Sequence, residues 1–369
     1  MPLADRRTFI RFSALAAGVG AAGVGTVAAS TALADRAAQP APKPPTPVEL
    51  TPSFGAKSFQ ETKPGAGGRA KAGGPNLQEA SGIVASRRHP GVFWIIRDSA
   101  GDPYNYRRAI YAVRFDARAG RLLRWGASVR QTSCDGYLKH VFVYDRSGAL
   151  VRNTDIEDVA YEIGTTPARN RIWFGNIGNN GHHARSMQLF RCPEPNPFTD
   201  TKVTVEGQVT FWSRKNHRAP QVNSEALFVA HGVPHVLVKT APSDCELQQG
   251  HILRIDPRLG GTLDAVPVAM LKSPSKQTSF KPTGADFRQG GLLLCRANGW
   301  LRYDASNPRL RGDALMRDIA ARPAGAMGYW RPDETLAAVE ASAWIPGTPD
   351  GVLSVSETGT FRWLRSARG

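Results

Sequence analysis

The chain has 369 residues, of which 41% are hydrophobic and 21% charged, and its formal net charge is +16. The hydrophobic content can form a sizeable core, and 37 glycines with 27 prolines favour many turns over long helices. The positive charge favours anionic partners, either an anionic cell-envelope polymer or a small anionic ligand, unless it only reflects an arginine-rich genome. The sequence has no basic run interleaved with aromatic residues, so it does not indicate specific nucleic-acid binding.

Residues 1–34 have the features of an export signal. Arg6 and Arg7 precede an uncharged stretch rich in alanine, glycine and valine, and Ala32-Leu33-Ala34 forms a small-residue cleavage site. The pattern predicts a twin-arginine signal peptide, cleavage before Asp35 and a secreted, extracytoplasmic protein. An ordinary secretory signal and an uncleaved anchor are the alternatives. The stretch is weakly hydrophobic for a membrane span, so we expect no span after cleavage.

An internal repeat fills residues 77–369, after a Pro/Gly-rich linker at residues 35–76. Each unit opens with a short apolar strand beside an acidic residue. A second apolar strand ends in a polar turn, and a third strand carries an arginine at one fixed place. These arginines are Arg114, Arg191, Arg254, Arg302 and Arg362.

Five such units predict an all-β fold, a β-propeller of five blades, each a four-stranded antiparallel sheet. The last unit lacks an outer strand, which residues 48–60 of the linker could supply to close the ring. Closure would leave fewer exposed strand edges. Residues 118–139 are an insertion in the first unit or the remnant of a sixth blade, which would make six. We expect a monomer.

Three motifs carry a family resemblance. They are Glu79-Ala-Ser-Gly-Ile with Arg97-Asp98-Ser99, Asp155-Ile-Glu-Asp-Val-Ala with Gly175-Asn-Ile-Gly-Asn-Asn180, and Glu194-Pro195. Over residues 77–365 the chain resembles a group of secreted actinobacterial β-propeller proteins, which implies the same fold and export. Asparagines replace the aspartates of that family's turn at positions 176 and 179. They keep the turn geometry and one ligating oxygen but lose the charge, which weakens any metal site implied by the resemblance.

The repeat predicts an acidic mouth at one end of the central channel, because the first strand of each blade lines the channel of a propeller. The acidic candidates are Glu79, Glu157, Asp158, Glu225, Asp286 and Glu340. The loops around them contribute Asp98, Ser99, Asn176, Asn179, Asn180, Lys239, Arg296, Asn298 and Glu357. Such carboxylates could bind calcium, raise one another's pKa for proton transfer, or accept hydrogen bonds from backbone N–H groups of neighbouring strands. For a cation, the expected ligands are Glu157, Asp158 and Asn176.

Three functions therefore remain open, and whether the protein is an enzyme is not decided by the sequence. They are a ligand- or metal-binding module, a calcium-dependent hydrolase resembling lactonase or phytase propellers, and a structural or interaction protein. The sequence has no G-x-S-x-G, H-E-x-x-H or phosphate-loop motif.

The four cysteines, Cys134, Cys192, Cys245 and Cys295, have no C-x-x-C spacing, which argues against a cysteine zinc site. In an exported protein they could form two disulfides with three connectivities. Cys295 lies in an apolar run, and a buried thiol is the alternative there.

Overall fold

The computed structural model describes residues 48–49 and 77–364, with gaps at 78, 99–107, 153, 180–185, 213–221, 242–246, 273–279, 297–298, 330–338, 349 and 358. The chain divides into two units, Met1–Pro42 and Lys43–Gly369, and every described residue belongs to the second. The predicted signal peptide and nearly all of the predicted linker lie outside the described residues. Among the described residues, no helix combines the length and hydrophobicity of a membrane span.

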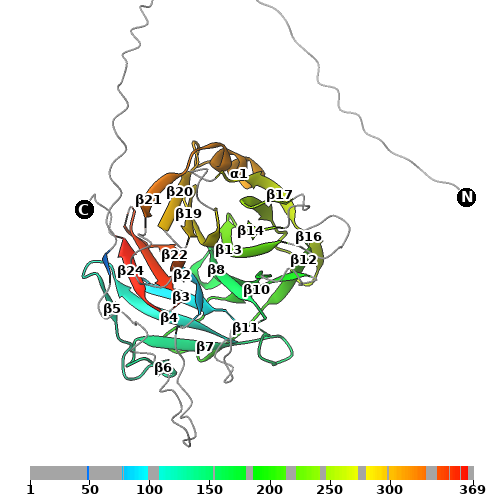
Figure 1. The fold of residues 1–369 in the computed structure, drawn as a ribbon. Helices are drawn as coiled ribbons and strands as arrows, with labels where there is room; N and C mark the ends of the chain where they lie inside the picture. Colours follow the sequence, from blue (N-terminus) through cyan, green and yellow to red (C-terminus); the bar gives the residue numbers. More distant parts are fainter. Residues whose placement is uncertain are drawn as a thin grey trace, which may run out of the picture. The chain divides into compact units, whose positions relative to one another are not determined.

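The described strands form five sheets (Figure 1). Sheet 1 contains β2 (Ala80–Ala85), β3 (Val92–Arg97), β4 (Ala109–Asp116), β7 (Leu138–Tyr144) and β11 (Lys202–Thr204), with β5 (Arg121–Leu123) and β6 (Thr132–Ser133) beside them. Sheet 2 contains β8 (Ile156–Glu162), β9 (Arg171–Asn176), β10 (Met187–Pro193), β12 (Gly207–Trp212) and β16 (Thr262–Asp264). Sheet 3 contains β13 (Asn223–Ala230), β14 (Val233–Thr240), β15 (His251–Arg254) and β17 (Val266–Met270).

Sheet 4 contains β18 (Pro282–Arg288), β19 (Gly291–Arg296), β20 (Gly299–Asp304) and β21 (Gly325–Tyr329). Sheet 5 contains β22 (Val339–Trp344), β23 (Val352–Ser356), β24 (Phe361–Leu364) and β1 (Val48–Glu49). The described helices are the short 3-10 helix η2 (Pro167–Arg169) and α1 (Gly312–Ala321).

The five sheets close into a ring. Their first strands contact one another in cyclic order, β2 with β8, β8 with β13, β13 with β18, β18 with β22, and β22 with β2. One apolar cluster lies between each neighbouring pair of sheets, and the cluster between sheets 1 and 5 joins Phe93 to Phe361. The fold is therefore an all-β propeller, and β2, β8, β13, β18 and β22 are its inner strands.

Two sheets are larger than the predicted four antiparallel strands. Part of the 118–139 segment forms β5 and β6, which pair with β4 and β7 of sheet 1 and make no separate sheet. Two further strands join an outer edge in parallel, β11 beside β7 and β16 beside β12. Each of these short strands comes from a connecting segment, and such pairing satisfies an edge that would otherwise be exposed.

The closing strand comes from the N-terminal side. Val48 and Glu49 pair antiparallel with Trp363 and Arg362 of β24, so that β1 is the outer strand of sheet 5. The rest of the segment predicted to supply this strand, residues 50–60, lies outside the described residues. Pairing of the two ends of the propeller in one sheet joins the ring by backbone hydrogen bonds as well as by packing.

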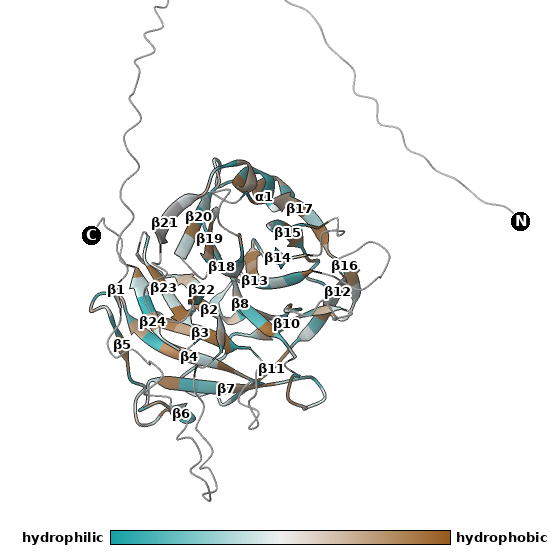
Figure 2. Ribbon diagram, viewed as in Figure 1, coloured by the Kyte–Doolittle hydropathy of each residue, from teal (hydrophilic) through white to brown (hydrophobic). Residues whose placement is uncertain are grey.

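Short, nearly continuous apolar runs explain why the middle strands form, because a strand that is buried on both faces needs apolar side chains on both. Figure 2 shows apolar stretches next to hydrophilic ones along β3 and β4. The middle strands β3 and β19 are buried along their whole length, because each has another sheet on either side. Polar contacts also join the sheets, since Glu194, which follows β10 of sheet 2, accepts a hydrogen bond from Trp94 Nε1 of sheet 1 at 3.0 Å. Arg302 of sheet 4 pairs with Asp350, which follows β22.

The two predicted disulfides do not form. Cys192 and Cys295 are fully buried free thiols in different sheets, and two disulfides would need all four cysteines. Burial raises the pKa of Cys295 to about 12, which makes it an unreactive core residue. Cys245 lies outside the described residues.

Candidate functional site

A β-bulge marks the same place near the start of every inner strand. At this place the register with the second strand skips one residue of each inner strand, and these residues are Ser81, Glu157, Glu225, Thr283 and Glu340. β13 has a further register shift between Asn223 and Ser224. A bulge turns an extra side chain out of the ladder. The structurally equivalent set therefore contains three of the predicted acidic residues together with Ser81 and Thr283. Glu79 lies two residues before this position and Asp286 lies three residues after it.

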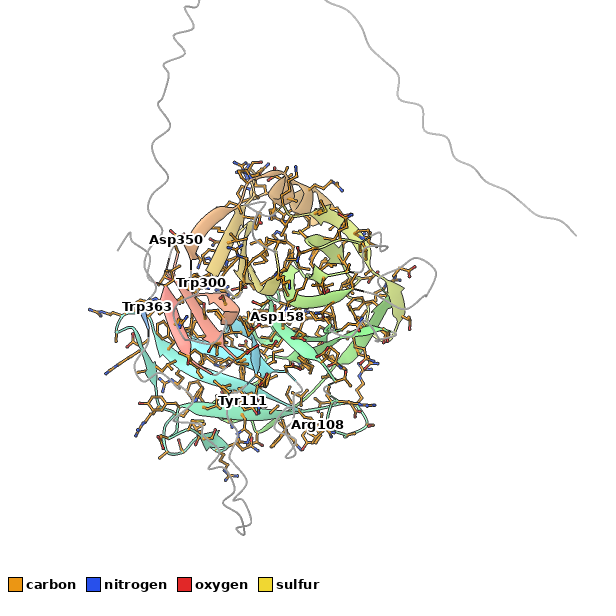
Figure 3. The ribbon with its side chains drawn as sticks, in the orientation of Figure 1. Arg108, Tyr111, Asp158, Trp300, Asp350 and Trp363 are labelled. Carbon is orange, nitrogen blue, oxygen red and sulfur yellow. The ribbon has the colours of Figure 1, made fainter. Side chains whose placement is uncertain are left out.

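Asp158 follows the bulge of β8 and lies near the centre of the ring (Figure 3). It is fully buried, and its carboxylate accepts hydrogen bonds from the backbone N–H groups of Val159 at 2.8 Å, Leu227 at 2.8 Å and Ala285 at 3.0 Å. One side chain thereby joins three inner strands. Burial raises the pKa of Asp158 well above its usual range, while these three N–H groups act in the opposite direction.

Small residues make room for this carboxylate. The positions equivalent to Asp158 in the other inner strands are Gly82, Ala226, Gly284 and Ala341. A Cβ atom at Gly82 would lie 2.8 Å from the Asp158 Oδ1 atom and 2.6 Å from the backbone nitrogen of Val159. A single acid therefore occupies the centre because its counterparts have little or no side chain.

An acidic cavity of about 190 Å³ opens at the end where the inner strands begin. Its lining contains the side chains of Glu79, Asp98, Glu157, Glu225, Lys239, Glu340 and Glu357, with Ser81 beside them. The structure thus brings together four of the six acidic residues that the sequence predicted for the channel mouth. Asp158 and Asp286 do not line this cavity. Asp286 is buried, and its Oδ2 accepts a hydrogen bond from the backbone N–H of Trp344 at 2.9 Å.

Three carboxylates gather most closely at the sheet 1 and sheet 2 side of this end. Asp98, Asp155 and Glu157 each have an oxygen within 4.8 Å of the others. Glu157 is 4% exposed, and its Oε2 accepts a hydrogen bond from Ser81 Oγ at 3.0 Å. Its Oε1 has no hydrogen-bond partner among the described residues. Orphaned buried oxygens are rare, because leaving one unpaired costs about 1–3 kcal/mol.

The turn after β9 shapes this cluster. Gly178 leaves space for it, since a Cβ atom there would lie 2.2 Å from Asp155 Oδ2 and 2.3 Å from Glu157 Oε1. The Oδ1 atom of Asn176 accepts hydrogen bonds from the backbone N–H groups of Thr154 and Asp155 at 3.2 and 3.4 Å. Asn176 therefore holds the backbone that carries Asp155 and is not itself part of the carboxylate cluster.

The carboxylates perturb one another's protonation. Burial raises the pKa of Asp155 to about 6, and the charge of Asp98 adds to the effect. Burial also raises the pKa of Glu157 well above its usual range, with further contributions from Glu225, Asp98 and Asp155. In Glu340, burial and then Glu357 raise the pKa to about 9. Burial and mutual repulsion thus make these carboxylates harder to ionise, and a bound cation would favour their charged forms.

Of the remaining predicted loop residues, Lys239 lies in the acidic cavity, and Asn179 and Arg296 do not line it. Lys239 forms an ion pair with Glu225, and this pair places one positive charge inside the acidic cavity. Asn179 is buried and donates from Nδ2 to the backbone oxygen of Val222 at 3.2 Å. Arg296 is buried in β19 and does not line the cavity. Ser99, Asn180 and Asn298 lie outside the described residues.

Sequence reasoning missed Asp155 and Gly178 as members of the site. Both belong to motifs that carried the family resemblance, so a signal was present. Of the three expected cation ligands, the structure places only Glu157 in the carboxylate cluster. Asp98 and Asp155 take the places expected for Asp158 and Asn176, because Asp158 turns into the core and Asn176 is engaged by backbone N–H groups.

Comparisons with known proteins find no family and only distant structural likenesses. No protein-family model matches the chain, and no curated protein matches it. A PQQ-bound aldose sugar dehydrogenase from Streptomyces coelicolor is 12% identical over 79% of this chain and 95% of its own, with a TM-score of 0.41. An exo-β-1,3-galactanase from Clostridium thermocellum is 12% identical over 86% of this chain and 61% of its own, also at 0.41. A putative gluconolactonase is 10% identical over 79% of this chain and 89% of its own, at 0.37.

Proposed function

We propose that the protein is an exported propeller that binds calcium at the acidic end of its channel, with Asp98, Asp155 and Glu157 as ligands. The observation that carries this proposal is the close approach of three carboxylates, since Asp98, Asp155 and Glu157 each place an oxygen within 4.8 Å of the others. Among the described residues, no side chain or backbone group donates a hydrogen bond to the buried Glu157 Oε1. A cation at this point would satisfy that oxygen and relieve the repulsion among the three acids.

The donor set favours a hard cation. Calcium takes six to eight oxygen ligands and tolerates irregular geometry, whereas cysteine and histidine would be expected for zinc. The cluster offers carboxylate oxygens from two sheets, and the cavity beside it supplies further acidic side chains. The coordination sphere would be completed by water and by oxygen atoms of a bound ligand. The protein would therefore act as a ligand-binding module whose metal can contact the ligand.

Calcium titration of the purified protein, followed by isothermal calorimetry and by thermal unfolding, tests the proposal. At calcium concentrations of about 100 times Kd, binding should add about 2.7 kcal/mol to the free energy of unfolding. Glu157→Gln removes one ligand charge, and Gly178→Ala places a methyl group where the two carboxylate oxygens meet. Both variants should lose the response to calcium. Asp264→Asn, an exposed position on β16, is the matched control and should keep it.

The proposal fails if the wild-type protein and the Glu157→Gln variant respond equally to calcium, or if neither responds. In that case the acidic residues serve the structural role that Asp158 performs. Calcium-dependent hydrolysis, the other use that the sequence suggests for the same cation, stays a prediction. To support that prediction, the protein would have to hydrolyse a lactone or a phosphate ester, and chelation of calcium would have to abolish the hydrolysis.

A further inference from the structure

A second and larger cavity lies at the opposite end of the inner strands. Its volume is about 970 Å³, within the range of about 300–1,000 Å³ that is usual for small-molecule sites. Its lining includes residues one or two positions beyond the ends of inner strands, namely Arg87 after β2, Ile163 after β8, His231 after β13 and Gln289 after β18. The acidic cavity is formed where the same strands begin. The two cavities therefore occupy the two ends of the channel.

The charge of this second cavity is the reverse of the first. Arg87, Arg288 and Arg311 line it together with His231, and the carboxylate in its lining is Asp286. Asp286 is 5% exposed and accepts a hydrogen bond from the backbone N–H of Trp344, so most of its charge is directed into the core. Three arginines thus line the space, with one buried carboxylate in the same lining.

Arg288 is held at the cavity wall, close enough to Arg87 for the two charges to interact. Arg288 donates hydrogen bonds to the backbone oxygens of Ile345 and Thr348, each at 3.2 Å, which fixes its guanidinium at the cavity wall. Burial and the nearby Arg87 charge lower the pKa of Arg288. Like charges crowded around a cavity attract an anion, and guanidinium groups bind carboxylate and phosphate with paired hydrogen bonds.

The lining also has an apolar part. Ile163 is 69% exposed, an unusual state for an isoleucine, and Phe287 and Val229 lie in the same cavity with two prolines. An exposed apolar wall beside a cationic wall is complementary to a molecule that has an apolar part and an anionic group. A simple inorganic anion would leave the apolar wall in contact with water.

We propose that this cavity binds a small amphipathic anion, with a carboxylate or phosphate group held by Arg87 and Arg311 and an apolar body placed against Ile163 and Phe287. The site is separate from the calcium site, because Asp158 and its three hydrogen bonds lie between the two ends of the inner strands. The proposal therefore does not depend on calcium binding.

Octyl phosphate, 1-octanol and inorganic phosphate are suitable probes. Octyl phosphate has both an apolar chain and a phosphate group, whereas 1-octanol has only the chain and inorganic phosphate only the anion. Calorimetric titration of the purified protein should show octyl phosphate binding at least about tenfold more tightly than either half, since hydrogen bonds to charged groups contribute about 1.5–3 kcal/mol. The double variant Arg87→Gln with Arg311→Gln should weaken octyl phosphate binding by about tenfold or more. Arg258→Gln, at a side chain that is 78% exposed outside the cavity, should leave the affinity unchanged.

Two further variants separate this proposal from loss of folding and from the calcium site. Ile163→Glu changes an exposed position and should weaken octyl phosphate binding by adding a like charge. Glu157→Gln should bind octyl phosphate as the wild-type protein does. Equal affinity for octyl phosphate and octanol, equal affinity in the wild-type protein and the double arginine variant, or no binding of octyl phosphate at all would each overturn the proposal.

Discussion

Replacement of Asp158 by alanine tests whether the acid at the centre of the ring is structural. The change leaves the backbone N–H groups of Val159, Leu227 and Ala285 without the acceptor they have now. Each unsatisfied buried group costs about 1–3 kcal/mol. Part of this loss is offset, because the variant no longer buries a carboxylate, which is itself unfavourable. We therefore expect a loss of about 3–5 kcal/mol in the free energy of unfolding, a large fraction of the about 5–15 kcal/mol of a typical domain.

Urea denaturation followed by tryptophan fluorescence measures this loss, because Trp94, Trp173 and Trp300 are fully buried. Asp158→Asn should lose less than the alanine variant, since its amide oxygen can still accept from Leu227 and Ala285. Asp264→Asn serves as the exposed control. An unchanged unfolding midpoint in Asp158→Ala would refute the structural role. A lost calcium response at unchanged stability would show instead that Asp158 is a ligand, as the sequence first suggested.

Two further predictions concern the acidic cavity and the export signal. The folded pKa of Glu340, about 9, lies above the ordinary value of 4.5, so the folded protein keeps a proton that the unfolded chain releases. The stabilising contribution of this group should be complete below about pH 4.5 and should fall as the pH rises towards 9, by up to about 1.4 kcal/mol per pH unit. Glu340→Gln should flatten this slope in calcium-free urea titrations from pH 5 to 8, and equal slopes would contradict the assignment. Replacing Arg6 and Arg7 by lysine should leave unprocessed precursor in the cytoplasm, and normal export of that variant would exclude the twin-arginine route.

The repeat in the sequence was enough to predict the all-β propeller. An apolar strand, a polar turn and a third strand with its arginine recur in each unit, and each unit became one sheet. The additional strands could not be predicted, because β11 and β16 are three residues long and pair in parallel with strands far away in the sequence. Such short segments carry no periodicity of their own.

The register of the inner strands was harder to predict than the sheets. An alignment guided by acidic residues placed Glu79 and Asp286 beside Glu157, whereas the bulges show that Ser81 and Thr283 hold the equivalent positions. A bulge is a backbone feature and leaves no fixed residue type in the sequence. The Asp98–Asp155 contact also joins loops of two different sheets. These two residues come together only when the ring closes, so no local sequence pattern predicts the contact.

The acids of the inner strands divide by position into two kinds. Asp158 and Asp286 lie within the strands, and their oxygens accept hydrogen bonds from backbone N–H groups of neighbouring strands. Glu157, Glu225 and Glu340 lie at the bulges and extend into a cavity, where Lys239 is the basic residue of the lining. The adjacent pair Glu157–Asp158 shows the division most clearly, because one residue faces the cavity and the next faces the core. A shift of one residue in a strand reverses the direction of a side chain, so the bulge decides which acid is structural and which is free to bind a cation.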